Sequence, residues 1–206
     1  MKNILQLNSS LFGESAQSTA LAERVVATLA AGANSGSGEG RPVVTVRDLA
    51  AQPLPHLTGE RFAAFTAPVA GRTAEQSLVV AESDALIDEL RRADVVVIGL
   101  PMYNFGIPST LKAYFDHIAR AGVTFGYTEQ GPVGLLTGKK AYVIATRGGR
   151  YARTALDLQS AYVRQFLGFV GIDDVEFVYA EGLAYGDETR AAALNDAGVR
   201  IEQLAA

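Results

Sequence analysis

The chain has 206 residues, a formal net charge of −4 and no cysteine. The charge does not suggest a nucleic-acid-binding surface, and 49% hydrophobic residues are too many for a disordered acidic protein. Without cysteine there are no disulfides, thiolate nucleophiles or Cys-ligated metals; only two histidines remain, so we expect no metal site. The length predicts one domain over residues 1–206.

The sequence also lacks the patterns of membrane and export segments. A membrane-spanning helix needs about 20 consecutive apolar residues, and the best run, 95–100, is followed directly by a proline. Residues 1–8 contain a single lysine and too short an apolar stretch for a signal peptide. We therefore expect a soluble, cytoplasmic protein with neither membrane nor nucleic acid as partner.

Five short β-rich runs alternate with five segments of helical periodicity. In chain order they are 3–7 (strand), 18–31 (helix), 43–47 (strand), 74–92 (helix), 95–100 (strand), 108–121 (helix), 140–146 (strand), 154–170 (helix), 175–179 (strand) and 187–204 (helix). Three of the strands are almost continuously apolar, which is typical of strands buried on both faces. This alternation predicts an α/β fold, a flavodoxin-like doubly wound five-stranded parallel sheet with helices on both faces.

Two segments interrupt the alternation. Residues 32–41 form a polar, glycine-rich stretch, typical of a surface turn. Residues 49–72 contain three prolines and form a long connection, in which we expect a short helix near 59–65. This second insertion either covers a site or is a plain surface insertion.

Ligands of open α/β sheets bind beyond the carboxyl ends of the strands, where the strand order reverses. For the order 2-1-3-4-5 this point lies between the first and third strands, so we expect the site in the loops after strands one, three and four. The loop 8–19 is rich in hydroxyls and precedes a helix, which suits a phosphate; it matches neither the P-loop nor the dinucleotide-binding pattern. The alternative is a serine-rich helix cap.

The other two loops favour a ring system. Residues 101–108 place aromatic and methionine side chains directly after a buried strand, which would form an apolar wall, or else they simply pack on the core. Residues 146–151 contain the pair Gly148 and Gly149, which lets a backbone with free N–H groups approach a ligand. The alternative there is a turn with surface arginines.

These loops carry a resemblance that extends over nearly the whole chain. The sequence resembles the FMN-dependent NADH-azoreductase family, a branch of the flavodoxin-like quinone reductases. The most specific segments are 102–112, 122–125, 127–129, 131–132, 138–140, 146–149, 166–169 and 171–172. The resemblance implies a homodimer that binds one non-covalent FMN per chain, takes electrons from NADH or NADPH, and reduces quinones and azo compounds in two steps.

The resemblance also assigns roles to residues. It implies that the FMN phosphate side is held by Ser10, Ala16, Gln17 and Ser18. It implies that the isoalloxazine is framed by Met102, Tyr103, Asn104, Phe105, Thr146, Arg147, Gly148 and Gly149. It further implies that the partner chain provides the substrate-stacking wall, for which we predict Phe125, Tyr127 and Phe169.

Two departures from the family pattern concern FMN binding. Family members often carry serine where this chain has Ala16, which leaves only a backbone N–H there, and Thr146 replaces a frequent serine but keeps the hydroxyl.

Because the flavin carries the chemistry, no dedicated catalytic side chain is expected. His117 directly follows Asp116 on a predicted helix, so the two cannot share a face as a catalytic pair, and we expect a structural role for His117. Two other functions remain as alternatives: a flavodoxin-type electron carrier without its own substrate pocket, and a phosphoacceptor signalling domain. The latter needs an acidic cluster after the first strand, where this chain has Asn8, Ser9 and Ser10.

Overall fold

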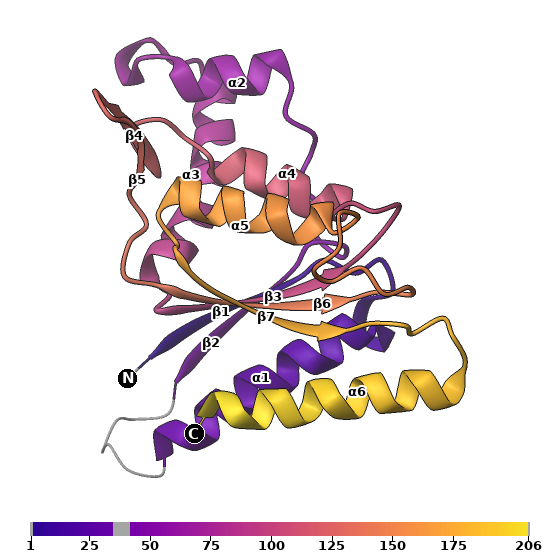
Figure 1. The fold of residues 1–206 in the computed structure, drawn as a ribbon. Helices are drawn as coiled ribbons and strands as arrows, with labels where there is room; N and C mark the ends of the chain where they lie inside the picture. The colour runs from indigo at the N-terminus through magenta and orange to yellow at the C-terminus, as the bar shows by residue number, and fades with distance from the viewer. Residues whose placement is uncertain (1, 35–41, 206) are drawn as a thin grey trace.

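The computed structural model describes residues 2–34 and 42–205. Five parallel strands form the central sheet in the order β2-β1-β3-β6-β7, as predicted (Figure 1). The strands are β1 (Asn3–Asn8), β2 (Val43–Asp48), β3 (Val95–Pro101), β6 (Lys140–Thr146) and β7 (Asp174–Ala180). The expected glycine-rich turn at 32–41 falls almost entirely outside the described residues.

Helices cover both faces of the sheet (Figure 1). One face carries α1 (Gln17–Asn34) and α6 (Asp187–Glu202); the other carries α3 (Ala74–Arg92), α4 (Ser109–Ile118) and α5 (Leu158–Val170). Short 3-10 turns, η1 (Gly13–Ser15), η2 (Val69–Gly71) and η3 (Gln203–Ala205), complete the helical elements. None of the helices within 2–34 and 42–205 has the length and apolar character needed to cross a bilayer.

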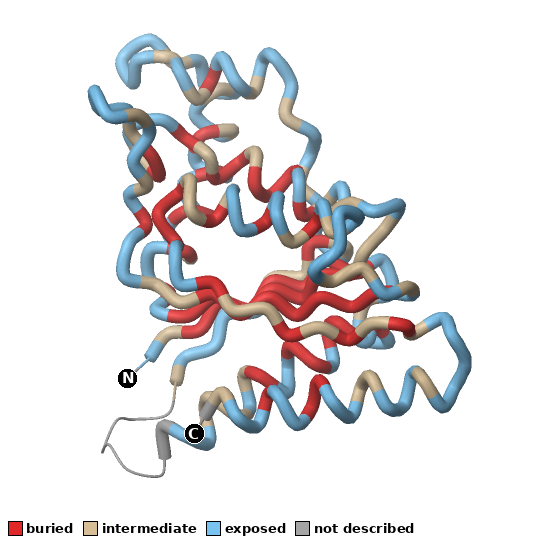
Figure 2. The backbone as a smooth tube through the Cα atoms, in the orientation of Figure 1, coloured by how far each residue is buried: buried red, intermediate tan, exposed pale blue. Residues whose placement is uncertain are grey.

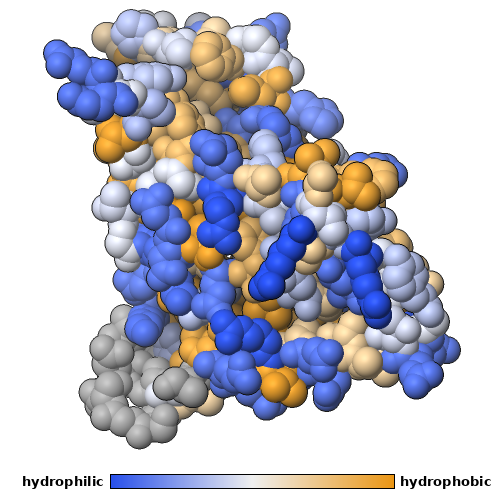
Figure 3. Space-filling view, in the orientation of Figure 1, coloured by the Kyte–Doolittle hydropathy of each residue, from blue (hydrophilic) through white to orange (hydrophobic). Residues whose placement is uncertain are grey.

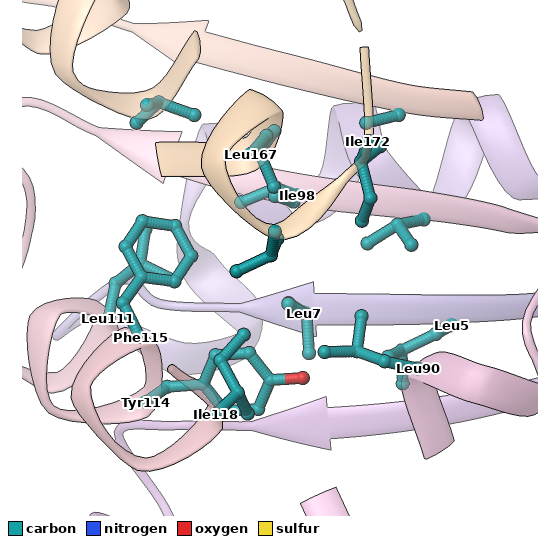
Figure 4. Packing of buried hydrophobic residues seen from close by; sticks show 14 of the residues in the cluster. Leu5, Leu7, Leu90, Ile98, Leu111, Tyr114, Phe115, Ile118, Leu167 and Ile172 are labelled. Atoms are coloured by element: carbon teal, nitrogen blue, oxygen red, sulfur yellow. The ribbon is translucent and has the colours of Figure 1, made fainter. Parts of the chain in front are cut away.

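The core explains why the inner strands are apolar at nearly every position. Successive side chains of a strand point to opposite faces, so Leu5 and Leu7 pack toward α3, α4 and α5, whereas Ile4 packs toward α1 and α6. Figure 2 shows the sheet buried between layers whose outer surfaces are exposed. In Figure 4 Phe115 of α4 and Leu167 of α5 lie against the sheet near Ile98. Burial of each such side chain stabilises the folded protein by about 1.5–3 kcal/mol.

The insertion at 49–72 contains α2 (Gly59–Thr66), close to the helix expected there. Arg61 of α2 donates from Nε to Nε2 of His117 at 3.0 Å, and Phe65 meets the His117 ring edge-on. His117 is fully buried, and its Nδ1 lies 2.7 Å from the carbonyl oxygen of Ala113. Because Nε2 accepts from Arg61, Nδ1 must donate to that carbonyl. His117 therefore has the expected structural role, because its contacts with Arg61 and Phe65 connect α2 to α4.

The segment after α4, where the sequence predicts neither a helix nor a strand, is not a simple loop. It forms an antiparallel hairpin of β4 (Phe125–Thr128) and β5 (Gly131–Gly134). Strands of four residues are too short to be recognised by alternation alone. The hairpin packs on the end of α5 so closely that a Cβ at Gly134 would lie 2.0 Å from the backbone nitrogen of Gly171.

Helix α5 also begins later than the expected residue 154. The Asp157 side chain accepts from the Ser160 N–H at 3.0 Å and so caps the helix there, while Thr154 and Asp157 donate backbone bonds within preceding turns.

Candidate active site

The carboxyl ends of β1, β3 and β6 border a crevice of about 410 Å³. It lies where the strand order reverses, the position expected for a ligand of this fold. A larger hollow of about 790 Å³ lies at the amino edge of the sheet, but Gly32 and Pro42 line it, and these residues flank a segment outside the described residues. The crevice is therefore the better-defined site. Its walls include the predicted residues Ser10, Ala16, Gln17, Ser18, Met102, Tyr103, Thr146, Arg147 and Gly148.

One end of the crevice is the amino terminus of α1. The first backbone N–H groups of a helix have no partner within it, so they attract anions. Ser18 adds a buried hydroxyl, 1% exposed, whose oxygen has no hydrogen-bond partner in the described structure. Gly99 on β3 lets α1 approach this closely, because a Cβ there would lie 3.1 Å from the Ser18 carbonyl oxygen. These unpaired donors suit a phosphate.

Ala16 differs from the expectation for this end. Its N–H was expected to remain available, but it donates to the Gly13 carbonyl at 3.2 Å. The cause is the 3-10 turn η1, which closes immediately before α1. Ala16 therefore contributes a buried methyl group to the wall and no donor.

The second loop is joined to the first through Tyr103. The Tyr103 hydroxyl lies 3.1 Å from Ser10 Oγ and accepts from the Leu11 N–H at 3.1 Å. Met102 donates its N–H to the Thr146 carbonyl at 3.1 Å, so the second and third loops are also joined. The predicted polar and apolar walls are thus parts of one hydrogen-bonded structure.

Asn104 and Phe105 form the tip of a tight hairpin and do not line the crevice. Tyr103 and Gly106 exchange two backbone hydrogen bonds, and both residues between them have positive φ, 50° and 66°. This is the geometry of a two-residue I′ turn, which is costly for a residue other than Gly, Asn or Asp. The turn leaves Phe105 51% exposed, with its ring edge-on to Tyr151 at 5.6 Å.

The third loop presents the two glycines. The carbonyls of Gly148 and Gly149 accept from Ala184 and Gly182 at 3.0 and 2.9 Å, while their N–H groups have no acceptor among the described residues. A Cβ on Gly149 would lie 2.6 Å from the Tyr151 ring. Only glycine fits at 149 without moving that ring. Gly149 supports the turn behind the crevice wall, whereas Gly148 lines the wall itself.

Arg147 lies beside these glycines, but its side chain points into the protein. It is fully buried and forms ion pairs with Asp157 at 2.7 Å and Glu181 at 3.0 Å. Burial alone would raise the pKa of Asp157, but hydrogen bonds from Arg147 and from the Ser160 N–H outweigh burial and hold that pKa below its usual range.

A fourth loop, after β7, was missing from the sequence-based site. Leu183 in this loop lines the crevice, because the segment 182–184 pairs with 147–149 alongside β6. The glycines at 182 and 186, both with positive φ, mark a turn at the carboxyl end of the fifth strand and were the available signal. Phe12 and Ser15 also line the crevice and were missed.

The predicted aromatic residues come together elsewhere. The Phe125 ring lies 4.3 Å from that of Phe169 and 5.6 Å from that of Tyr127. None of the three lines the crevice. They lie at the hairpin and the carboxyl-terminal end of α5, at the other end of the sheet from the crevice (Figure 1).

Comparison with known proteins agrees with this geometry. The family model described as a flavodoxin-like fold matches residues 2–205. An FMN-dependent NADH:quinone oxidoreductase 6 of Burkholderia lata is 56% identical over 206 residues, covering 100% of both chains. An FMN-dependent NADH:quinone oxidoreductase of Alcanivorax borkumensis is 51% identical over 203 residues, covering 98% of both chains.

Solved structures give the same assignment. An azoreductase from Bacillus anthracis superposes with a TM-score of 0.86 at 28% identity, covering 100% of this chain and 99% of that one. A second structure from that species, an FMN-dependent NADH-azoreductase in complex with FMN, has a TM-score of 0.84 at 27% identity and covers 100% of both chains. The resemblance inferred from the loop motifs is confirmed: the chain belongs to the flavodoxin-like fold family, in the branch of FMN-dependent NADH:quinone oxidoreductases and NADH-azoreductases.

Proposed function

We propose that this chain is an FMN-dependent oxidoreductase that uses NADH or NADPH to reduce quinones and to cleave aromatic azo compounds. The observation that carries the proposal is the pair of unsatisfied donor sets at the crevice. One set is the first turn of α1 with the orphaned Ser18 hydroxyl, and the other is the N–H pair of Gly148 and Gly149.

These donors fit FMN. The α1 terminus with Ser10, Gln17 and Ser18 would hold the phosphate, because that end offers unpaired N–H groups to a dianion. Met102, Tyr103 and Thr146 would line the ring, and Gly148 and Gly149 would donate to its carbonyl edge. When bound, FMN supplies the redox chemistry by accepting a hydride from the nicotinamide and passing two electrons to the acceptor.

The chain's own part is to bind and orient the cofactor. Arg147 is neutralised by Asp157 and Glu181, so it offers no free cation to the crevice. The donors that face the ring edge are therefore backbone amides, which are fixed before any charge develops there and need not reorganise.

The substrate wall requires a second copy of the chain in this proposal. Tyr127 is 75% exposed and contacts Phe125, which in turn contacts Phe169, and all three lie away from the crevice of their own chain. A homodimer that brings this wall over the partner's crevice would let nicotinamide and acceptor stack there in turn. Double-reciprocal plots at several acceptor concentrations should then be parallel, and intersecting lines would contradict a shared place.

The decisive test is the absorption spectrum of the purified protein. We expect flavin bands that bleach on addition of NADH alone and recover on addition of a quinone. A flavodoxin-type carrier would show the bands without rapid bleaching by NADH, and a phosphoacceptor domain would be colourless. The same proposal places the protein in the cytoplasm, where reduced nicotinamide nucleotides are available as donors.

A further inference from the structure

The side chain of Arg147 makes an unusually complete set of contacts. Its guanidinium donates to Asp157 Oδ1 at 2.7 Å, to Ser160 Oγ at 2.8 Å and to Glu181 Oε1 at 3.0 Å. Its Nε donates to Gln159 Oε1 at 3.3 Å, and the guanidinium lies 5.1 Å from the centre of the Tyr179 ring. The side chain is 0% exposed, so it has no group left for a ligand.

Glu181 extends this contact to the far end of the third loop. Its Oε1 also accepts from the N–H groups of Tyr151 and Ala152, each at 2.9 Å. The Glu181 carboxylate, which directly follows β7, therefore contacts both ends of the third loop. It binds the beginning through Arg147 and the end through the N–H groups of Tyr151 and Ala152. We call Arg147, Asp157 and Glu181 the clamp.

The backbone of the loop is bonded along the same side. The carbonyls of residues 147, 148 and 149 accept from the N–H groups of 183, 184 and 182. In the segment 147–149 this leaves the N–H groups of Gly148 and Gly149 as the donors without an acceptor in the described structure, and Gly148 lines the crevice.

Stability alone is a poor explanation of the clamp. Burying a guanidinium with two carboxylates carries a large desolvation cost, and well-packed apolar residues often give equal or greater stability. Two glycines in succession form a backbone with many accessible conformations, so fixed amides at this point require outside support. The clamp provides that support from three directions: the end of β6, the start of α5 and the loop after β7.

We propose that Arg147 and Glu181 are positioning residues, which hold the N–H groups of Gly148 and Gly149 in a pre-organised pair directed at the electron-rich edge of the flavin. This inference rests on the proposed binding of FMN in the crevice. It changes the expected role of Arg147: the side chain acts through the glycine amides and does not itself touch the cofactor.

Glu181→Gln tests the proposal, because it preserves size while removing the charge and one acceptor oxygen. Because this change weakens the contacts that fix the end of the loop, we expect the Kd of the apoprotein for FMN to rise about tenfold, equivalent to about 1.4 kcal/mol. Amide hydrogen exchange at Tyr151 and Ala152 should be faster in the Glu181→Gln apoprotein than in the wild-type apoprotein. The midpoint potential of bound FMN should fall, because donors that stabilise the more electron-rich state are lost.

The sign of the potential change separates positioning from a simple charge effect. Removing a negative charge near the flavin would by itself raise the potential. A raised potential with unchanged amide exchange would therefore overturn the proposal. So would an unchanged Kd and potential in a variant that folds.

Glu89→Gln is the matched control. Glu89 on α3 accepts from Arg47 at 2.6 and 2.8 Å; its side chain is 17% exposed, close to the 15% of Glu181, and neither Glu89 nor Arg47 lines the crevice. We expect this variant to lose thermal stability without changing FMN affinity or potential, and equal changes in both variants would contradict the proposal.

If Glu181→Gln does not fold, Glu181→Asp keeps the charge but shortens the reach, and it should weaken FMN binding in the same direction. A wild-type protein that fails to bind FMN would overturn the proposed function together with this inference, whereas normal wild-type binding with unaffected variants would overturn the inference alone.

Discussion

The two ends of α5 differ in what they leave unsatisfied. At its amino-terminal end, beside the crevice, the clamp residues are paired with one another, whereas the N–H groups of Gly148 and Gly149 and the Ser18 hydroxyl have no partners in the described structure. At its carboxyl-terminal end the hairpin leaves an aromatic cluster, with Tyr127 largely exposed. On the face drawn in Figure 3, hydrophilic side chains cover most of α6, and hydrophobic ones gather near the right-hand ends of α4 and α5.

This difference motivates the shared site proposed above. Within one chain the crevice and the aromatic cluster lie at opposite ends of the strands. In the proposed function, a second copy of the chain brings its aromatic cluster over the crevice. Substitutions at either end can be made separately, because the two ends share no residue.

The largest effect is expected at the polar end, from Gly148→Val. A Cβ at this position would already lie 3.3 Å from the Ala184 Cβ, and Gly148 lines the crevice, so a branched side chain cannot be added without moving the wall. We expect the Kd for FMN to rise at least about a hundredfold, equivalent to about 2.8 kcal/mol, with a native circular dichroism spectrum. Gly71→Val is the control, because a Cβ there meets nothing within 4 Å. Normal FMN content in Gly148→Val would count strongly against this site.

At the aromatic end, Tyr127→Ala should reduce turnover rather than cofactor binding. Its ring lies edge-on to Phe125, and its exposure makes a large loss of stability unexpected. Loss of an aromatic stacking partner costs about 0.5–1.5 kcal/mol, so kcat/KM for the acceptor should fall up to about tenfold while FMN content is unchanged.

Val199→Ala, an exposed apolar change on α6, is the control for Tyr127→Ala. It should leave both kcat/KM for the acceptor and FMN content unaltered.

Phe169→Arg should weaken the dimer and the activity together. If light scattering finds an active monomer at assay concentration, activity does not need the partner's aromatic cluster, and the shared site is refuted.

Ser18 and Ser9 give a sharper contrast within the polar end. Both are buried, but Ser9 Oγ donates to the Gly99 carbonyl at 2.7 Å, whereas the Ser18 hydroxyl has no partner in the described structure. Ser18→Ala should weaken FMN binding about fivefold and leave the stability of the apoprotein unchanged. Ser9→Ala should cost about 1 kcal/mol of stability. Fluorescence titration and thermal melts of both apoproteins measure the two effects, and the reverse pattern would contradict the assignment of Ser18.

The smallest effect concerns pH. The pKa of Asp157 is held below its ordinary value in the folded protein, since hydrogen bonds from Arg147 and the Ser160 N–H outweigh the raising effect of burial. Its contribution, on the order of 1 kcal/mol, is thus present above the ordinary carboxyl pKa and is lost as the pH falls through the lowered folded value. Denaturant melts should show Asp157→Asn losing less stability on acidification than wild type. Parallel losses would contradict this role.

The predictions from the sequence succeeded where a feature depends on local pattern. The five strands and their parallel order follow from apolar runs that alternate with helical periodicity, and three loops of the crevice follow from their position after those strands. A short helix near 59–65 is expected within the long connection, and the observed α2 agrees.

Only the tertiary structure decided the features that depend on residues distant in the chain. The inward direction of Arg147 depends on Glu181, 34 residues away, and the contribution of Leu183 depends on β7 lying beside β6. The hairpin at 125–134 packs against the end of α5 through a close contact of Gly134 with Gly171. In each case the deciding interaction is a contact between segments that no local periodicity encodes, whereas strands and helices are visible locally because burial repeats at their own period.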